Sequence, residues 1–148
     1  MFKPPFLFFL FGLFLFLISC KSTNNQQNGI ETTLLLDRAD SLARSNTDTA
    51  FGLYKTVIDN VSSKGTLYNV RALHGIGKIY AFEGKYDSAG VSYSQALAIS
   101  ISLNDTALII KSHLLKGNNY GDTQRYTDSE KEFTEGLKLA KAYKSLNL

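Results

Sequence analysis

The chain has little of several residue types that build metal sites, form cross-links or interrupt helices. Its 148 residues include one cysteine, two histidines, two prolines and no tryptophan. A single cysteine excludes an intramolecular disulfide. His74 and His113, without a clustered cysteine or carboxylate, make a poor structural zinc site, which needs four ligands. Both prolines stand at positions 4 and 5, so no proline interrupts a helix in the rest of the chain.

Long apolar runs are absent except at the start of the chain. One cation, Lys3, precedes 13 consecutive apolar residues from Phe6 to Ile18. A helix needs about 20 apolar residues to cross a bilayer, so this run is too short to span one. A short apolar run after a basic residue is typical of a secretory signal peptide, and we expect residues 1–19 to be one.

The end of that run, Leu17-Ile18-Ser19-Cys20, resembles the lipobox of bacterial lipoproteins. The resemblance implies cleavage before Cys20, lipidation of Cys20 and attachment to a membrane of a bacterial cell envelope, with inner and outer membrane both open. Residues 20–29 are then the lipidated cysteine and a flexible polar tether. The alternative is an ordinary signal peptide or a short hydrophobic anchor, with Cys20 incidental.

The chain after the tether is expected to be helical, because apolar residues recur at helical spacing and strand-like alternation is absent. The helical segments resemble one another at a spacing of about 40 residues, which makes Tyr54, Tyr93 and Phe133 equivalent. Gly77 and Gly117 match at the same spacing. Fixed self-similarity of this kind indicates a repeat array. We expect three units of two helices each.

The middle unit resembles the tetratricopeptide repeat. The residues that carry the resemblance are Gly77, Tyr80, Gly84, Tyr86, Ala89, Tyr93 and Ala96. It implies an all-α fold, a right-handed α-solenoid over residues 30–148, with a period of about 40 residues. The units are expected over about 31–65, 70–103 and 110–148. The first unit matches only in its second helix, and the third departs from the pattern at Lys116, Ser129 and Gly136.

The stretch Gly75-Ile76-Gly77-Lys78 invites comparison with a phosphate-binding loop but lacks the pattern. A Walker-type loop has a glycine five residues before the Gly-Lys pair and a serine or threonine after it, whereas this chain has Ala72 and Ile79 there. Glycines in a helix instead allow a neighbouring helix to approach closely. Serine, histidine and aspartate residues show no catalytic arrangement, so we expect no enzyme and no cofactor.

In tetratricopeptide-repeat proteins the first helix of each pair lines a groove for a peptide or a partner's helix, and the resemblance implies such a groove here. Its candidate residues are Arg71, His74, Lys78, Phe82, Lys111, Leu114 and Asn118. Lys78 with Asn118 resembles part of the arrangement by which some members of the family bind a terminal carboxylate. We therefore expect an acidic or carboxylate-terminated partner segment; a solvated basic face is the alternative. His113 is expected to point inward.

Neither sign of charge is in large excess, since residues 20–148 carry 15 Lys and Arg against 13 Asp and Glu. This balance excludes a general nucleic-acid binder. The predicted function is a membrane-anchored lipoprotein that acts as a protein–protein interaction adaptor in the cell envelope. The alternative is the truncated sensory front of a signalling protein with a histidine-kinase or DNA-binding output. Leu137, Ala140 and Tyr143 of the last helix need cover, so self-association there is a further expectation.

Overall fold

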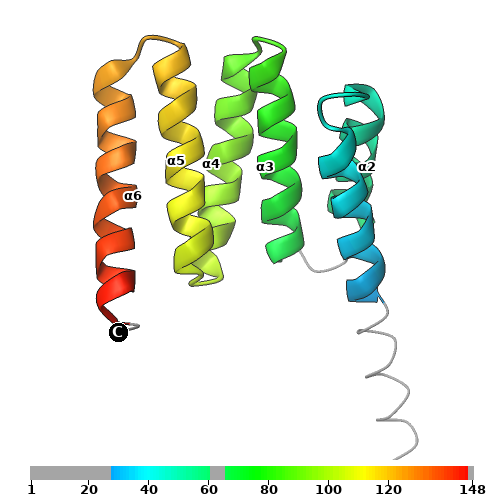
Figure 1. Ribbon diagram of the computed structural model, residues 1–148, viewed down its shortest axis with the longest axis horizontal. Helices are drawn as coiled ribbons and strands as arrows, with labels where there is room; N and C mark the ends of the chain where they lie inside the picture. The colour runs from blue at the N-terminus through cyan, green and yellow to red at the C-terminus, as the bar shows by residue number, and fades with distance from the viewer. Residues whose placement is uncertain (1–27, 61–65, 147–148) are drawn as a thin grey trace, which may run out of the picture. The chain divides into compact units, whose positions relative to one another are not determined.

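The computed structural model describes residues 28–60 and 66–146 (Figure 1). The predicted signal peptide, Cys20 and the first part of the predicted tether lie outside the described residues. Residues 28 and 29, which were expected in the tether, are instead the first residues of a helix. Among the described residues, 35–60 and 66–146 belong to one compact unit, and residues 28–34 belong to another.

The described residues form six helices and no strand, which confirms the all-α prediction. They are a first helix over residues 28–42, α2 (Thr47–Asn60), α3 (Leu67–Phe82), α4 (Tyr86–Ser102), α5 (Thr106–Asp122) and α6 (Tyr126–Leu146). From α2 to α6 each helix packs against the next in chain order, and α3 also contacts α5 (Figure 1). This is the arrangement of an α-solenoid. None of the described helices is long and apolar enough to cross a membrane.

The turns between helices repeat at the predicted spacing. Gly84 follows α3 with a φ of +74°, a left-handed conformation that glycine adopts without strain. Gln124 stands at the equivalent place after α5 and adopts a similar φ of 60°. Asp105 caps the start of α5 by accepting a hydrogen bond from the backbone N–H of Leu108 at 3.0 Å. The turns after α3 and α5 therefore repeat with the same period as the helices.

Glycines in α3 and α5 receive aromatic rings from the helices that follow them. A Cβ on Gly77 would lie 2.4 Å from the ring of Tyr93 in α4, and a Cβ on Gly117 would lie 2.6 Å from the ring of Phe133 in α6. Any side chain at either glycine would displace the ring. The expected role of Gly77 and Gly117 in close helix packing is confirmed.

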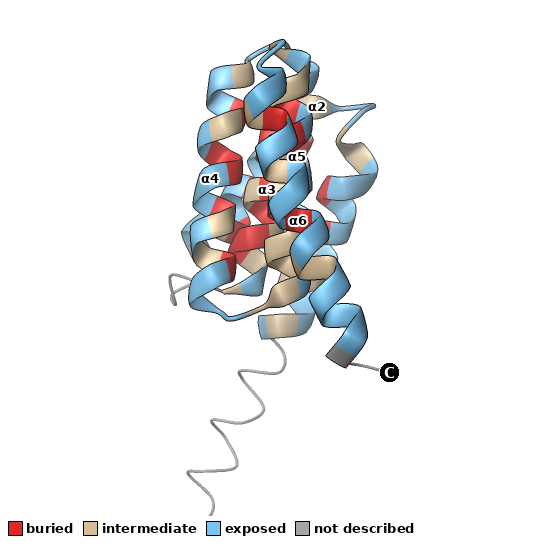
Figure 2. Cartoon of the chain, turned by 90° about the vertical axis from the view of Figure 1, so that its left-hand side faces the viewer, coloured by how far each residue is buried: buried red, intermediate tan, exposed pale blue. Residues whose placement is uncertain are grey.

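Tyr54 of α2 packs across the boundary between the first and second helix pairs. Its ring lies against Gly75 of α3, where a Cβ would come within 2.2 Å of it. Tyr54 is 1% exposed, and its core cluster includes Leu36 and Ala39 of the first helix and Ile76 of α3. Figure 2 shows such buried residues on the sides of the helices that face one another. The ring of Tyr54 thus joins the first pair to the second.

Candidate functional site

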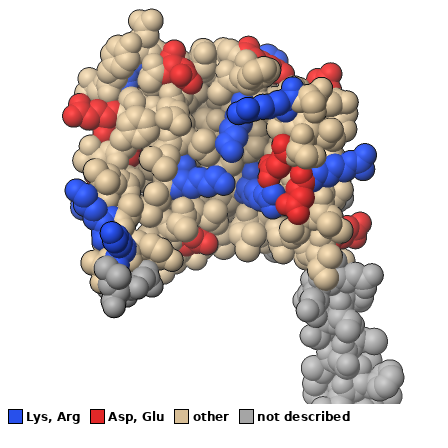
Figure 3. Space-filling model, viewed as in Figure 1, with Lys and Arg blue, Asp and Glu red and all other residues tan. Residues whose placement is uncertain are grey.

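A hollow of about 570 Å³ opens beside α3 and is called the basic hollow here. Five of the predicted groove residues line it: Arg71, His74, Lys78, Phe82 and Lys111. Leu114 and Asn118, which lie further along α5, do not line it. Figure 3 shows basic side chains gathered over α3 and α5, next to acidic side chains over the first helix. The structure therefore brings most of the predicted groove together beside α3.

The basic hollow also includes residues that the sequence analysis did not assign to it. Asp40 and Ser41 come from the end of the first helix, Arg44 from the turn after it, and Tyr54 from α2. Asp40 and Tyr54 belong to different helices, and their positions in the sequence give no sign that they meet. The first unit resembles the tetratricopeptide repeat only in its second helix. The resemblance therefore gave no way to assign residues of the first helix to the groove.

Arg71 belongs to an internal network of ion pairs. Its guanidinium donates to Asp37 Oδ1 at 2.7 Å through Nη2 and to Asp40 Oδ2 at 3.1 Å through Nε. The Tyr54 hydroxyl donates to the other oxygen of Asp40 at 2.5 Å. Burial raises the pKa of Asp40, but the hydrogen bonds from Tyr54 and Arg71 outweigh burial and hold that pKa below its ordinary value. This aspartate clasp ties the first helix, α2 and α3 together, and it uses the charge of Arg71.

Lys78 and Lys111 are cations of the basic hollow that have no carboxylate within ion-pair distance in the described part of the chain. Burial and repulsion from Lys78 lower the pKa of Lys111, and together they outweigh the opposite effect of Asp40. Both lysines line the same hollow, so an anion bound there lies near both of them. Phe82, one turn beyond Lys78 on α3, is 74% exposed and lines the same hollow. Two cations and an apolar ring are thus offered to a ligand.

His74 lies in the wall of the basic hollow rather than on an exposed face. It was predicted as an exposed groove residue, but it is only 2% exposed. Its Nε2 bonds with Ser112 Oγ of α5 at 2.8 Å, while Nδ1 has no hydrogen-bond partner among the described residues. Burial, together with the charges of Lys111 and Lys78, lowers the pKa of His74 to about 4. His74 is therefore neutral at physiological pH.

His113 is partly buried and hydrogen-bonded, in agreement with its expected inward position. Its Nδ1 lies 2.7 Å from Glu132 Oε2 of α6, and the side chain of His113 is 16% exposed. No group of three or more histidine, cysteine, aspartate or glutamate residues that could hold a metal ion occurs within residues 28–60 and 66–146.

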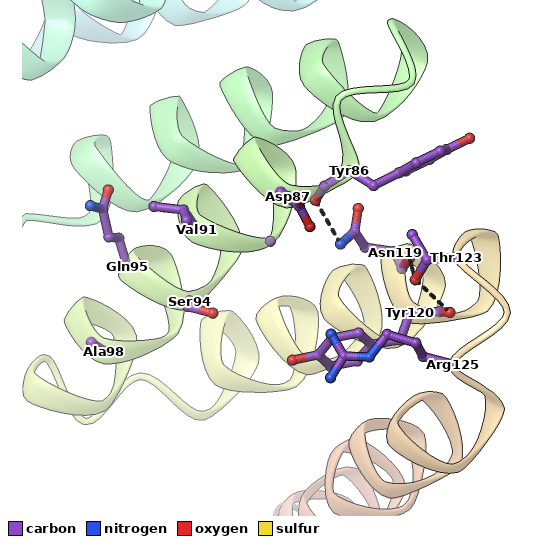
Figure 4. A pocket seen from close by; sticks show the side chains of 11 residues that line it. Tyr86, Asp87, Val91, Ser94, Gln95, Ala98, Asn119, Tyr120, Thr123 and Arg125 are labelled. Atoms are coloured by element: carbon purple, nitrogen blue, oxygen red, sulfur yellow. Dashed lines mark hydrogen bonds between the residues drawn. The ribbon is translucent and has the colours of Figure 1, made fainter.

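A second hollow of about 560 Å³ lies between α4 and α5 (Figure 4). Its cation, Arg125, lies over the ring of Tyr120 at 4.5 Å and pairs with Asp128 at 2.6 Å. Asn119 in its wall donates through Nδ2 to the backbone oxygen of Tyr86 at 3.1 Å. Because this guanidinium is already paired, the second hollow attracts an anion less than the basic hollow does. The basic hollow is the stronger candidate site.

The comparisons with known proteins concern the unit formed by α3 and α4. Residues 70–100 match the family model of the tetratricopeptide repeat. This match supports a tetratricopeptide-repeat protein, and such repeats generally bind protein or peptide partners. The searches of curated proteins and of solved structures found no match.

The third repeat departs from the tetratricopeptide pattern at Lys116, and the structure gives the reason. Lys116 stands where the second repeat has Ile76, and its side chain is 15% exposed. Its ammonium lies 2.7 Å from Glu132 Oε1, and Glu132 stands where the second repeat has Ser92. Burial raises the pKa of Glu132, but the hydrogen bonds from Lys116 and His113 outweigh burial and lower it. Two departures from the repeat therefore compensate one another.

Proposed function

We propose that the chain is a protein-binding scaffold whose basic hollow holds the free C-terminus of an acidic partner segment. The observation that carries the proposal is the pair of lysines, Lys78 and Lys111, which line one hollow and have no carboxylate within ion-pair distance among the described residues. A terminal carboxylate placed between them replaces ammonium repulsion with two attractive pairs. The tetratricopeptide match supports a peptide as the ligand.

The remaining parts of the hollow suit the same ligand. Phe82 offers an apolar surface for a side chain near the terminus, because its ring is largely exposed. The clasp through Arg71 and Asp40 fixes the first helix against α3, so the walls of the hollow are held in place before the ligand arrives. A preformed site loses less conformational entropy on binding.

A pooled library of acetylated hexapeptides tests the proposal. The full-length chain is offered the same random pool with free C-terminal carboxylates and with C-terminal amides, and the captured peptides are counted by mass spectrometry. We expect capture of the free acids to exceed that of the amides about tenfold or more, because a charged hydrogen bond contributes about 1.5–3 kcal/mol. The Leu114→Ala variant is the matched control, because Leu114 lies on α5 but does not line the basic hollow. Equal capture of both pools would contradict the proposal that the hollow binds a terminal carboxylate.

We further propose that Cys20 carries a lipid that anchors the scaffold to a membrane of a bacterial cell envelope. The order of basic residue, apolar run, Ser19, Cys20 and polar segment supports this assignment. Mass spectrometry of the protein purified from a bacterial membrane should show acylation at Cys20 and loss of residues 1–19. The Cys20→Ala variant should keep residues 1–19 and lack the lipid. An unmodified Cys20 inside an unprocessed chain would contradict the anchor.

A further inference from the structure

We propose that an anion bound at Lys78 and Lys111 brings a proton onto His74, so that the basic hollow binds its ligand more tightly as the pH falls. The inference rests on the proposed function, since it concerns the same hollow and adds a control by pH. Three features carry it: the place of His74 in the wall, the hydrogen bond that fixes its ring, and the two lysines beside it.

The hydrogen bonds around His74 leave one ring nitrogen to take up a proton. Ser112 Oγ donates to the backbone oxygen of Leu108 at 2.9 Å, so it accepts from the N–H at His74 Nε2. Nδ1 then carries the lone pair, and it has no partner among the described residues. Protonation at Nδ1 therefore leaves the bond to Ser112 in place, and the ring need not turn.

The charges around His74 are dominated by cations when the hollow holds no anion. Lys78 lies one turn after His74 on α3, and Lys111 immediately precedes Ser112 on α5. In the clasp Arg71 pairs with both Asp37 and Asp40, which leaves one net negative charge against the cations Lys78, Lys111 and Arg44 of the hollow. The charged and titratable groups that line the basic hollow with His74 are Asp40 and Arg44 near the end of the first helix, Tyr54 on α2, Arg71 and Lys78 on α3, and Lys111 on α5. Asp37 of the first helix pairs with Arg71, and Tyr93 of α4 packs against Gly77.

An anion in the hollow reverses the sign of this field. It offsets the repulsion that Lys78 and Lys111 exert on an imidazolium, and an opposite charge nearby raises the pKa of a histidine. Binding and protonation then strengthen one another by the same factor. Each unit by which the anion raises the pKa of His74 makes binding to the protonated protein about tenfold tighter than binding to the neutral protein.

The direction of the pH dependence follows from the pKa of His74 with and without the anion. Above the raised pKa both forms of the protein are neutral at His74, and affinity does not change with pH. As the pH falls through the raised pKa, the bound form takes up a proton and affinity increases. The increase ends below about pH 4, where His74 is protonated in the empty hollow as well.

An NMR titration of the histidine signals of the full-length chain tests this coupling. Inorganic sulfate is the probe, because it keeps its charge throughout the titration, and sodium chloride at equal ionic strength is the reference. The His113→Gln variant leaves His74 as the only histidine and assigns its signals. We expect sulfate to raise the pKa of His74 by about one unit relative to chloride. The double variant Lys78→Ala/Lys111→Ala should lose this rise.

Each contrary result has a distinct meaning. If sulfate shifts the backbone amide signals of Lys78 and Lys111 but leaves the pKa of His74 unchanged, the coupling is wrong and the anion site stands. If sulfate moves neither, the anion site is contradicted, and the coupling with it. An equal rise in the double variant would show that sulfate acts elsewhere, and it would also overturn the coupling. In the supporting case, the unchanged chain binds sulfate several-fold more tightly at pH 4 than at pH 6, and His74→Gln lacks this increase.

Discussion

The Gly77→Ala variant is expected to have a free energy of unfolding about 2 kcal/mol below that of the unchanged chain. A Cβ at this position would lie 2.4 Å from the ring of Tyr93, so the ring or the helix that carries it must move. Overpacking costs about 1–3 kcal/mol, and a contact this short with a ring belongs near the upper end of that range. The gain of about 1 kcal/mol that alanine has over glycine in a helix offsets part of this cost. Denaturant unfolding followed by circular dichroism measures the difference.

Gly52→Ala supplies the matched control for this prediction. Gly52 lies in α2, and a Cβ there would have nothing within 4 Å. Only the gain in helix propensity remains, so this variant should be about 1 kcal/mol more stable than the unchanged chain. The two alanine variants should therefore differ by about 3 kcal/mol. Equal effects on stability would contradict the packing of Tyr93 against Gly77.

Tyr54→Ala is expected to lower the free energy of unfolding by about 4 kcal/mol. The ring of Tyr54 is buried against Gly75 and joins the first helix pair to α3. Replacing a buried aromatic side chain by alanine removes its packing and leaves a cavity, at a cost of about 3–5 kcal/mol. Gly75 has no side chain to fill that cavity. The same denaturant measurement applies.

Tyr54→Phe separates the ring from its hydroxyl group. This variant keeps the packing against Gly75 and loses the hydrogen bond to Asp40, which is half-exposed in the clasp. We expect a loss of only about 1 kcal/mol, because solvent screens the interaction with Asp40. A loss as large as that of Tyr54→Ala would mean that the clasp, and not the ring, joins the first pair to α3.

The repeat spacing was sufficient to predict how the second and third helix pairs pack. Gly77 and Tyr93 are separated by the same number of positions as Gly117 and Phe133, and both pairs are in contact. Tyr54 is equivalent to the later aromatic residues but makes a different contact. The residue at the glycine's place in the first pair is Arg38 rather than a glycine, and the ring of Tyr54 lies against Gly75 instead. Periodicity shows which residues occupy equivalent positions in the repeat. The contact that each of them makes depends on the residue that it faces in the neighbouring helix.

The position of His74 could not be derived from a helical pattern with one buried face. Because α2, α4 and α5 all pack against α3, the four consecutive residues from His74 to Gly77 are buried. In a helix that packs against three others, a polar residue that lies off the main apolar stripe can still be buried. The bond between His74 and Ser112 joins residues 38 positions apart, and only the packing of α3 against α5 reveals it.

The sequence was enough to predict that the candidate site is basic. It was not enough to predict which of its cations pair with carboxylates of the chain. Arg71, Lys78 and Lys111 are equivalent as cations in the sequence. The structure pairs Arg71 with Asp37 and Asp40, while it leaves the two lysines for a ligand. This difference follows from Asp37 and Asp40 of the first helix, which the sequence analysis did not assign to the groove.

The affinity of one captured free-acid hexapeptide for the Lys78→Ala/Lys111→Ala variant, compared with the unchanged chain, tests the role of the basic hollow most directly. Isothermal titration calorimetry at two salt concentrations measures both. We expect the double variant to bind at least about tenfold more weakly and with a smaller dependence on salt, because two charged contacts are lost. Unchanged affinity and unchanged salt dependence in a folded double variant would show that the carboxylate is bound elsewhere on the chain.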